Sequence, residues 1–411
     1  MATTLQKRAG SALAIAAASL IALATLYPTA TPQPLRSPLC ILCGDLGTVD
    51  FVLNLLLFLP LGAGLRIAGL RRGHVLAIAL GATLFVELLQ LKIVAGRDAS
   101  LGDLLANALG GALGILLVDH GARPLRASGA RARVPAIVAA ALFVAALVGT
   151  GWALQRSLPD ARYWGQWRRA QVDTSRFRGD VVRVDVNGRP LVANLIPHDD
   201  PHVRAIRSDS LTLAATIRPG PPTSRVASIA SIGADPTYRL IVLAQHRQNL
   251  VMRLRLRASE LRLRSPSFGI PRVLSVASDG RPDTLSIAGS YLPGRVILRA
   301  GDSRADYPLT LGLGWTFFLP MELPLGGGTA LLNALWLALL VMPMAFWSAR
   351  AWRGPSPLIL PAAIAIAALA LLPAVFPLSA TTPWEWLGVV GGVALGSIIA
   401  RKVRGEPVTS V

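Results

Sequence analysis

A group of acids, amides and one arginine lies within the stretch "FVELLQLKIVAGRDASLGDLLANALGG", between two runs of hydrophobic sequence. Its members are Glu87, Gln90, Arg97, Asp103 and Asn107. The first two are three residues apart and the last two are four apart, so each pair would share one face of a helix. A carboxylate can act as a general acid or base, and an arginine can hold a phosphate through two hydrogen bonds. The group could therefore bind a charged head group or act on it chemically.

A third polar pair precedes this stretch, in the hydrophobic run "VDFVLNLLLFLPLGAGL". Asp50 and Asn54 are four residues apart and would also share a helix face. Ionisable groups at membrane depth are costly, and they persist where they find partners or line a polar interior. Two interpretations follow: a small polar pocket, or a buried network such as Arg97 with Glu87 or Asp103 that fixes how the helices pack.

The elements that would position these residues are hydrophobic segments long enough to cross a bilayer. The chain has 411 residues, of which 53% are hydrophobic and 15% are charged, whereas about 25% charged residues is usual in soluble domains. Apolar runs of about 17 to 25 residues can span a membrane, and such runs flank a polar region at 156–322. The predicted spans are residues 9–27, 49–66, 74–91, 101–118, 134–155, 327–349, 357–376 and 384–400.

Lysine and arginine in the short loops predict how the spans are oriented. With the N-terminus in the cytoplasm, the inner segments hold 14 of these residues and the short outer segments hold three. Both termini are therefore predicted to be cytoplasmic and residues 156–322 to be extracytoplasmic. The first span is predicted to be an uncleaved anchor, because "YPTATP" is a poor cleavage site. At a rise of 1.5 Å per residue, Asn54, Glu87 and Asn107 would each lie roughly 6 Å below the outer surface.

The polar residues fall within three ordered motifs, "DFVLNLLLFLPLGAGL", "ELLQ" and "RDASLGDLLANALGGALG". This order resembles the VanZ-like membrane proteins over about residues 1–120. The positions that match the family pattern are Asn54, Phe58, Pro60, Gly62, Glu87, Gln90, Arg97, Asp103 and Asn107. The resemblance implies a multi-pass protein of the bacterial cytoplasmic (inner) membrane. The family's namesake is linked to low-level resistance to the glycopeptide teicoplanin. Because the biochemical activity of that namesake is not established, the resemblance implies a location more than a mechanism.

The region 156–322 is predicted to be an extracytoplasmic all-β sandwich. Short alternating or β-branched runs such as "SLTLAATIRP", "RVASIASIG", "YRLIVLAQH", "DTLSIAG" and "RVILRAG" are separated by Gly, Pro, Asp or Asn, as in such sandwiches. The run "LVMRLRLRASELRLR" alternates strictly, which predicts one buried face and one basic face. The order of the runs resembles the concanavalin A-like or laminin-G jelly roll. This resemblance implies binding of glycans or proteins, and some domains of this kind also bind calcium. The region's 24 arginines against 14 acids either attract anionic envelope material or reflect a GC-rich genome.

Two further motifs have residue types that bind metals or undergo redox chemistry. Cys40 and Cys43 in "SPLCILCGD" form a local disulfide, stay free thiols or act as a redox pair, whereas zinc binding would need a second Cys or His pair nearby. The segment "PHDDPH" (residues 197–202) is interpreted as a solvated loop in preference to a metal site. The sequence predicts no metal and no cofactor. It also predicts no nucleic-acid partner, because the external region lacks interleaved aromatic and basic residues.

The chain thus divides into a five-helix VanZ-like domain (1–155), the β-sandwich (156–322) and three C-terminal helices (323–411). The last part is similar to the second to fourth spans, since "LLNALWLALLVMP" follows the pattern of "VLNLLLFLPLG" and "EWLGVVGGVALG" that of "DLLANALGGALG". Asn333 and Glu385 would then correspond to Asn54 and Asp103. This is either a degenerate repeat or an apolar coincidence.

Three functions are compatible with this organisation. The preferred one is an accessory protein of the cell envelope that binds lipid head groups or envelope polysaccharide and affects teicoplanin sensitivity. The second is a membrane enzyme acting on a lipid-linked glycan or phospholipid, with Glu87 or Asp103 as general acid or base and Arg97 on a phosphate. The third, a transporter, is disfavoured because the inner halves of the helices lack polar residues. Whether the protein is an enzyme is left open, and the expected partners are the lipid bilayer and envelope glycan.

Overall fold

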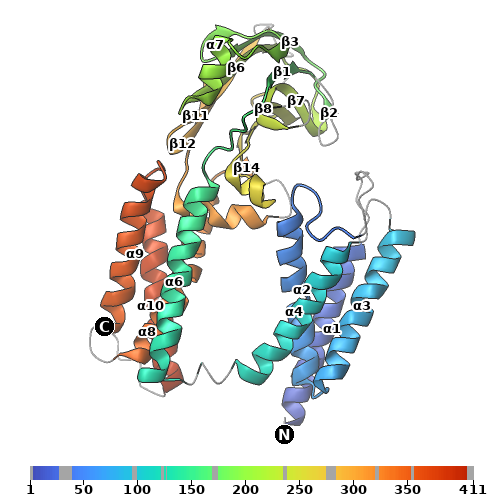
Figure 1. Ribbon diagram of the computed structural model, residues 1–411, viewed down its shortest axis with the longest axis vertical. Coiled ribbons are helices and arrows are strands. Elements are labelled where there is room, and N and C mark those ends of the chain that lie inside the picture. Colours follow the sequence, from blue (N-terminus) through green and yellow to red (C-terminus); the bar gives the residue numbers. More distant parts are fainter. Residues whose placement is uncertain are drawn as a thin grey trace. The chain divides into compact units, whose positions relative to one another are not determined.

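The structure is a computed structural model of the 411-residue chain. It describes residues 3–26, 39–94, 100–121, 125, 127–168, 175–234, 238–274, 284–319, 324–352 and 356–404. Within these residues, eight helices are long and apolar enough to cross a membrane, which confirms the predicted class of multi-pass membrane protein (Figure 1). They are α1 (Thr4–Leu26), α2 (Gly47–Ile67), α3 (Arg72–Lys92), α4 (Leu101–His120), α6 (Ala130–Ala153), α8 (Thr329–Ala351), α9 (Ser356–Val375) and α10 (Pro383–Arg404).

The chain forms two compact units, residues 1–135 with 261–264 and residues 136–260 with 265–411. The first unit contains α1 to α4, and the second contains the β-sheets and α8 to α10. The predicted domain boundaries near residues 155 and 322 stay a prediction.

Glycines set the close contact between α2 and α4 in the first unit. A Cβ atom on Gly110 would lie 2.3 Å from the carbonyl oxygen of Leu55, and one on Gly114 would lie 2.4 Å from that of Leu59. Gly10 of α1 packs against the backbone of α2 in the same way. Small residues of this kind let helix backbones approach closely. Such packing drives helix association in a bilayer, because lipid provides no hydrophobic driving force between helices. The glycines therefore fix which faces of α2 and α4 meet.

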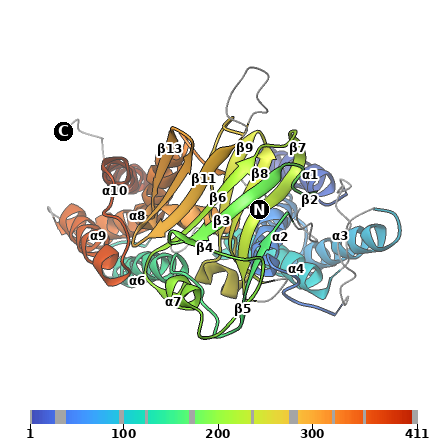
Figure 2. The same cartoon turned by 90° about the horizontal axis from the view of Figure 1, so that it is seen from above.

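The second unit contains two β-sheets among the described residues, and they pack face to face (Figure 2). One sheet has the order β14-β10-β9-β8-β7-β1-β5, with β2 also paired to β7, and the other has the order β13-β12-β11-β6-β3-β4. A Cβ atom on Gly289 of β11 would lie 2.7 Å from the sulfur of Met252 of β9, so the two sheets touch directly there. The strands are β1 (Tyr163–Trp167), β2 (Ser175–Arg176), β3 (Asp180–Val186), β4 (Arg189–Pro190), β5 (Asn194–Ile196), β6 (Leu211–Arg218), β7 (Thr223–Gly233), β8 (Arg239–Arg247), β9 (Asn249–Leu254), β10 (Ser267–Ile270), β11 (Leu285–Leu292), β12 (Arg295–Ala300), β13 (Ser303–Pro308) and β14 (Pro324–Leu325).

Strand β9 is shorter than the long alternating strand that the sequence predicted. The strand ends at Leu254, and the chain continues into the short 3₁₀ helix η1 (Arg257–Leu261). Leu250, Val251 and Met252 are consecutive, so they point to alternate faces, and all three are buried. From Met252 to Ala258 the burial does alternate as expected, with half-buried arginines between buried residues. Val251 is buried as well, because β9 lies inside its sheet, between β8 and β10. The region also contains the helix α7 (Pro201–Arg207), so it is not purely β.

Candidate functional site

Asn54 of α2 and Asp103 of α4 are joined by a hydrogen bond of 2.5 Å from the side-chain amide to Oδ1. Asp103 lies in the first turn of α4, for which Ser100 is the N-cap. The Ser100 hydroxyl accepts a hydrogen bond of 3.0 Å from the backbone N–H of Asp103, which is the usual role of a serine cap. The cap fixes the first turn of α4 and so holds the Asp103 carboxylate against α2.

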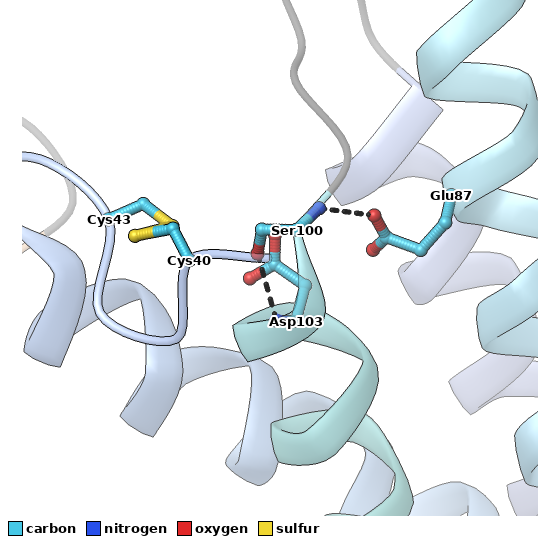
Figure 3. Close-up of a disulfide and its surroundings, with 5 residues drawn as sticks. All are labelled: Cys40, Cys43, Glu87, Ser100 and Asp103. Carbon is cyan, nitrogen blue, oxygen red and sulfur yellow. Dashed lines mark hydrogen bonds between the residues drawn. A yellow bond between two sulfur atoms is a disulfide. The ribbon is translucent and has the colours of Figure 1, made fainter. Parts of the chain in front are cut away.

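Glu87 of α3 reaches the same turn of α4 from another direction (Figure 3). Its Oε2 accepts a hydrogen bond of 2.9 Å from the backbone N–H of Ser100, one of the helix-terminal donors that have no partner within the helix. A carboxylate in this position also suits the positive end of the helix dipole. The other oxygen, Oε1, accepts no hydrogen bond from the residues that the structure describes. Two half-buried carboxylates therefore stand on either side of Ser100.

A buried amide lies one helical turn from this pair of carboxylates. Asn107, four residues after Asp103, donates a hydrogen bond of 2.8 Å to the hydroxyl of Thr83, four residues before Glu87. Asn107 is 2% exposed and Thr83 is fully buried. The Oδ1 atom of Asn107 is buried and has no hydrogen-bond partner among the described residues. An unsatisfied buried acceptor costs about 1–3 kcal/mol, so this oxygen favours a donor that lies outside the described residues.

Not all of the predicted pocket residues meet here. Gln90 is buried and donates a hydrogen bond of 2.9 Å to the carbonyl of Thr25, so it ties α3 to α1. Asp50 lies one turn before Asn54, and its side chain is exposed. Arg97, predicted to lie above the pocket, falls outside the described residues. The polar site is therefore defined by Asn54, Thr83, Glu87, Ser100, Asp103 and Asn107, of which Thr83 and Ser100 were missed from the sequence.

The loop before α2 packs on the start of α4. Cys40 and Cys43 in this loop are joined by a disulfide (Figure 3). The carbonyl of Cys40 accepts a hydrogen bond of 3.1 Å from the backbone N–H of Gly102. A Cβ atom on Gly102 would lie 1.9 Å from the carbonyl oxygen of Ile41, so a glycine is required at this contact. The disulfide loop thus covers the helix start next to Asp103.

The opposite ends of the same helices carry an ion-pair cluster that sequence reasoning missed. Asp119, near the end of α4, accepts hydrogen bonds of 2.7 Å from Nε of Arg66 at the end of α2 and from Nε of Arg72 at the start of α3. The Asp119 side chain is 9% exposed. The sequence signal was a single acid at the end of a span, in a region where the other loop charges are basic.

The segment "PHDDPH" forms the start of α7. Asp200 is the N-cap, and its Oδ1 accepts a hydrogen bond of 2.8 Å from the backbone N–H of His202. This backbone hydrogen bond is the main cause of a lowered pKa for the Asp200 carboxyl. Within the described parts of the chain, no group of three or more His, Cys, Asp or Glu side chains is arranged to hold a metal ion.

Comparison with protein-family models matches residues 7–120 to VanZ/LLP1. These residues form a VanZ-like domain. The match confirms the resemblance predicted from the ordered motifs, and it includes every residue of the polar site. Within the VanZ-like domain, the disulfide loop and helices α1 to α4 supply the contacts described above. No curated protein and no solved structure matches the chain significantly.

Proposed function

We propose that the protein is an accessory factor of the bacterial cell envelope, in which the VanZ-like domain binds a lipid head group at the outer face of the cytoplasmic membrane. The excess of Lys and Arg in the alternate short loops supports this orientation, with both termini inside. In that orientation the starts of α2 and α4 and the end of α3 lie at the outer surface, together with the polar site.

The observation that carries the proposal is Oδ1 of Asn107, which has no hydrogen-bond partner among the described residues and lies beneath two carboxylates at the Ser100 turn. A network that served packing alone would satisfy its buried acceptors internally, because a half-satisfied network is less stable than an apolar contact. The polar site instead leaves two acceptors without donors among the described residues, Oδ1 of Asn107 and Oε1 of Glu87. Such an arrangement favours binding of a group that donates hydrogen bonds.

The β-sheet region supports a second contact with the envelope, through glycan. Its 24 arginines and 14 acids give it a net positive charge, which attracts anionic polysaccharide. Guanidinium groups also lie over aromatic rings, 3.7 Å from the ring centre for Arg255 over Tyr238 and 5.7 Å for Arg207 over Tyr163. A glycan array probed with the purified full-length protein tests this contact, and the absence of binding to any anionic glycan would contradict it.

A membrane enzyme acting on a lipid-linked glycan or phospholipid is the second candidate. The Oε1 atom of Glu87 favours it, because a carboxylate oxygen without a donor could accept a proton from a substrate hydroxyl. Comparison of envelope lipids and glycans between a Glu87→Gln strain and the parent tests this function. An accumulated lipid-linked precursor would support the enzyme, and unchanged lipids and glycans would exclude it.

The experiment for the accessory function compares Glu87→Gln and Asp103→Asn, which keep the side-chain shape and remove the charge. We expect normal membrane abundance together with changed sensitivity to teicoplanin and other envelope antibiotics. Asp45→Asn is the matched control, because Asp45 is an exposed acid in the disulfide loop. A fall in abundance for both site variants would show a packing network instead, and unchanged abundance and sensitivity would show that the site is dispensable.

A further inference from the structure

A second polar centre lies at the start of α10, in the unit that contains the β-sheets. Glu385 is fully buried there. Its Oε1 accepts hydrogen bonds from the hydroxyl of Thr310 and, at 3.0 Å, from the amide of Asn333 in α8. Its Oε2 accepts one of 2.8 Å from the backbone N–H of Thr382, whose hydroxyl accepts one of 3.4 Å from the backbone N–H of Glu385. These reciprocal bonds form a capping box.

The centre at Glu385 has the same construction as the polar site of the VanZ-like domain. In both, a hydroxyl residue precedes the helix, a carboxylate follows three residues later, and an asparagine on the partner helix donates to that carboxylate. In the first site, these three roles are filled by Ser100, Asp103 and Asn54. In the second site, the same roles are filled by Thr382, Glu385 and Asn333.

Glycine contacts place the two helix pairs in the same register. Two glycines of α10 contact backbone carbonyls of α8. A Cβ atom on Gly392 would lie 2.5 Å from the carbonyl oxygen of Ala338, and one on Gly396 would lie 2.5 Å from that of Met342. These glycines stand seven and eleven residues after the carboxylate, as Gly110 and Gly114 do in α4. The contacted carbonyls also have the same spacing from a proline. In α2 they lie five residues and one residue before Pro60, at Leu55 and Leu59. In α8 they lie five residues and one residue before Pro343, at Ala338 and Met342.

The asparagines are equivalent in role but not in register. Asn333 lies ten residues before Pro343, and the residue ten positions before Pro60 in α2 is Asp50. Asn333 therefore corresponds to a position one turn before Asn54. The amide thus reaches the carboxylate from a neighbouring turn. Helix α9 contains no Glu, Asp, Gln or Asn within Ser356–Val375, so Glu87 has no counterpart.

The two sites differ in what fills them. In the second, the chain itself covers the carboxylate with the short helix η2 (Leu311–Phe318) and the preceding Thr310. A Cβ atom on Gly312 would lie 2.1 Å from Oε1 of Glu385, so η2 lies directly against it. The indole N–H of Trp315 donates a hydrogen bond of 2.8 Å to Asn333. Neutral hydroxyl and N–H donors on an apolar segment therefore occupy the second site.

We propose that the polar site of the VanZ-like domain takes the same kind of group from outside the chain, namely a neutral head group with several hydroxyls on an apolar lipid chain. The proposal rests on the proposed function and names its ligand class. Hydroxyls would donate to the acceptors that lack donors among the described residues, Oε1 of Glu87 and Oδ1 of Asn107. An anionic head group would instead meet the carboxylate of Glu87, and like charges at close range repel.

The test measures binding of octyl β-glucoside to the purified full-length protein in a detergent without hydroxyl groups. Octyl phosphate and octyltrimethylammonium have the same chain and serve as anionic and cationic probes. Ligand-induced thermal stabilisation at increasing probe concentration gives the dissociation constant. We expect octyl β-glucoside to bind most tightly, and Glu87→Gln to raise its dissociation constant about tenfold, as expected for the loss of one charge-assisted hydrogen bond.

Glu385→Gln is the matched control, because it makes the same change at the buried carboxylate of the filled site and should leave the dissociation constant unchanged. Tighter binding of the phosphate or ammonium probe that depends on Glu87 would overturn the proposal. Equal weakening by Glu87→Gln and Glu385→Gln would overturn it as well. If octyl β-glucoside does not bind but Glu87→Gln still alters antibiotic sensitivity at normal abundance, the ligand class is wrong and the proposed function stands. If it binds through Glu87 and sensitivity does not change, the proposed function fails instead.

Discussion

Arg66 and Asp119 form an ion pair with 2.7 Å between Nε and Oδ1, at the ends of α2 and α4. The second oxygen of the same carboxylate pairs with Arg72 at the start of α3. One carboxylate thus links three helix ends, and it does so at the opposite ends of α2 and α4 from Asn54 and Asp103. Polar contacts therefore link the helices of the VanZ-like domain at both ends, and glycine contacts lie between them.

Replacement of Asp119 by Asn should destabilise the VanZ-like domain, because two guanidinium groups lose their shared counter-charge. Asp119 is 9% exposed, but Arg66 is 28% and Arg72 is 62% exposed. We expect a loss of about 1–2 kcal/mol, between the values for surface and buried ion pairs. Thermal unfolding in detergent measures it, with exposed Asp45 changed to Asn as the control. Equal stability of the two variants would contradict the structural role of the cluster.

Replacement of Gly110 by Ala should separate α2 from α4. The added methyl group would lie 2.3 Å from the carbonyl oxygen of Leu55, which is backbone and cannot move aside without shifting the helix. We expect a loss of about 1–3 kcal/mol, typical of overpacking. Gly81→Ala is the control, because nothing lies within 4 Å of its notional Cβ in α3. That control should be neutral or stabilising by up to about 1 kcal/mol through helix propensity.

Replacement of Glu385 by Gln tests the filled site directly. The glutamine keeps the shape, but its amide group would face the donors Thr310, Asn333 and Thr382 with one acceptor oxygen in place of two. We expect a loss of about 1–3 kcal/mol, the cost of leaving buried donors unsatisfied. Chemical unfolding of the purified protein measures the change. Glu260→Gln, at an exposed position in η1, should stay within about 0.5 kcal/mol of the parent.

The membrane spans and most long strands could be predicted because each depends on a local pattern. The eight apolar runs have the length of a bilayer, and strands such as β6 and β12 have alternating or β-branched residues. Alternation around β9 correctly placed the arginines on one face, but it could not show that Val251 on the same face is buried. Burial of a residue on that face depends on the order of the strands in the sheet, which no local pattern contains.

The polar site could be predicted in part for the same reason. Spacing along one helix placed Asp103 and Asn107 on one face, but it could not show that Gln90 reaches α1 instead of the pocket. Ser100 had a signal that was overlooked, since a serine three residues before an acid at the start of an apolar run predicts a helix cap. The Asp119 cluster depends on which helix ends meet, and its partners are 53 and 47 residues away in the chain.

The N-cap of α7 should make the local stability of this helix depend on pH. The backbone N–H of His202 lowers the pKa of Asp200 in the folded state, so the carboxylate stabilises α7 above the unfolded pKa of about 3.9. This stabilisation is lost as the pH falls through the lower folded value. Asp200→Ala should therefore cost about 1 kcal/mol at neutral pH, and the difference from the parent should shrink below about pH 4. Hydrogen exchange of the α7 amides, corrected for intrinsic rates, measures this local stability.

Two variants serve as controls. Asp200→Asn should retain most of the cap without the pH dependence, and exposed Asp199→Ala should have no effect. An equal cost for Asp199→Ala and Asp200→Ala would show that the cap does not hold the helix.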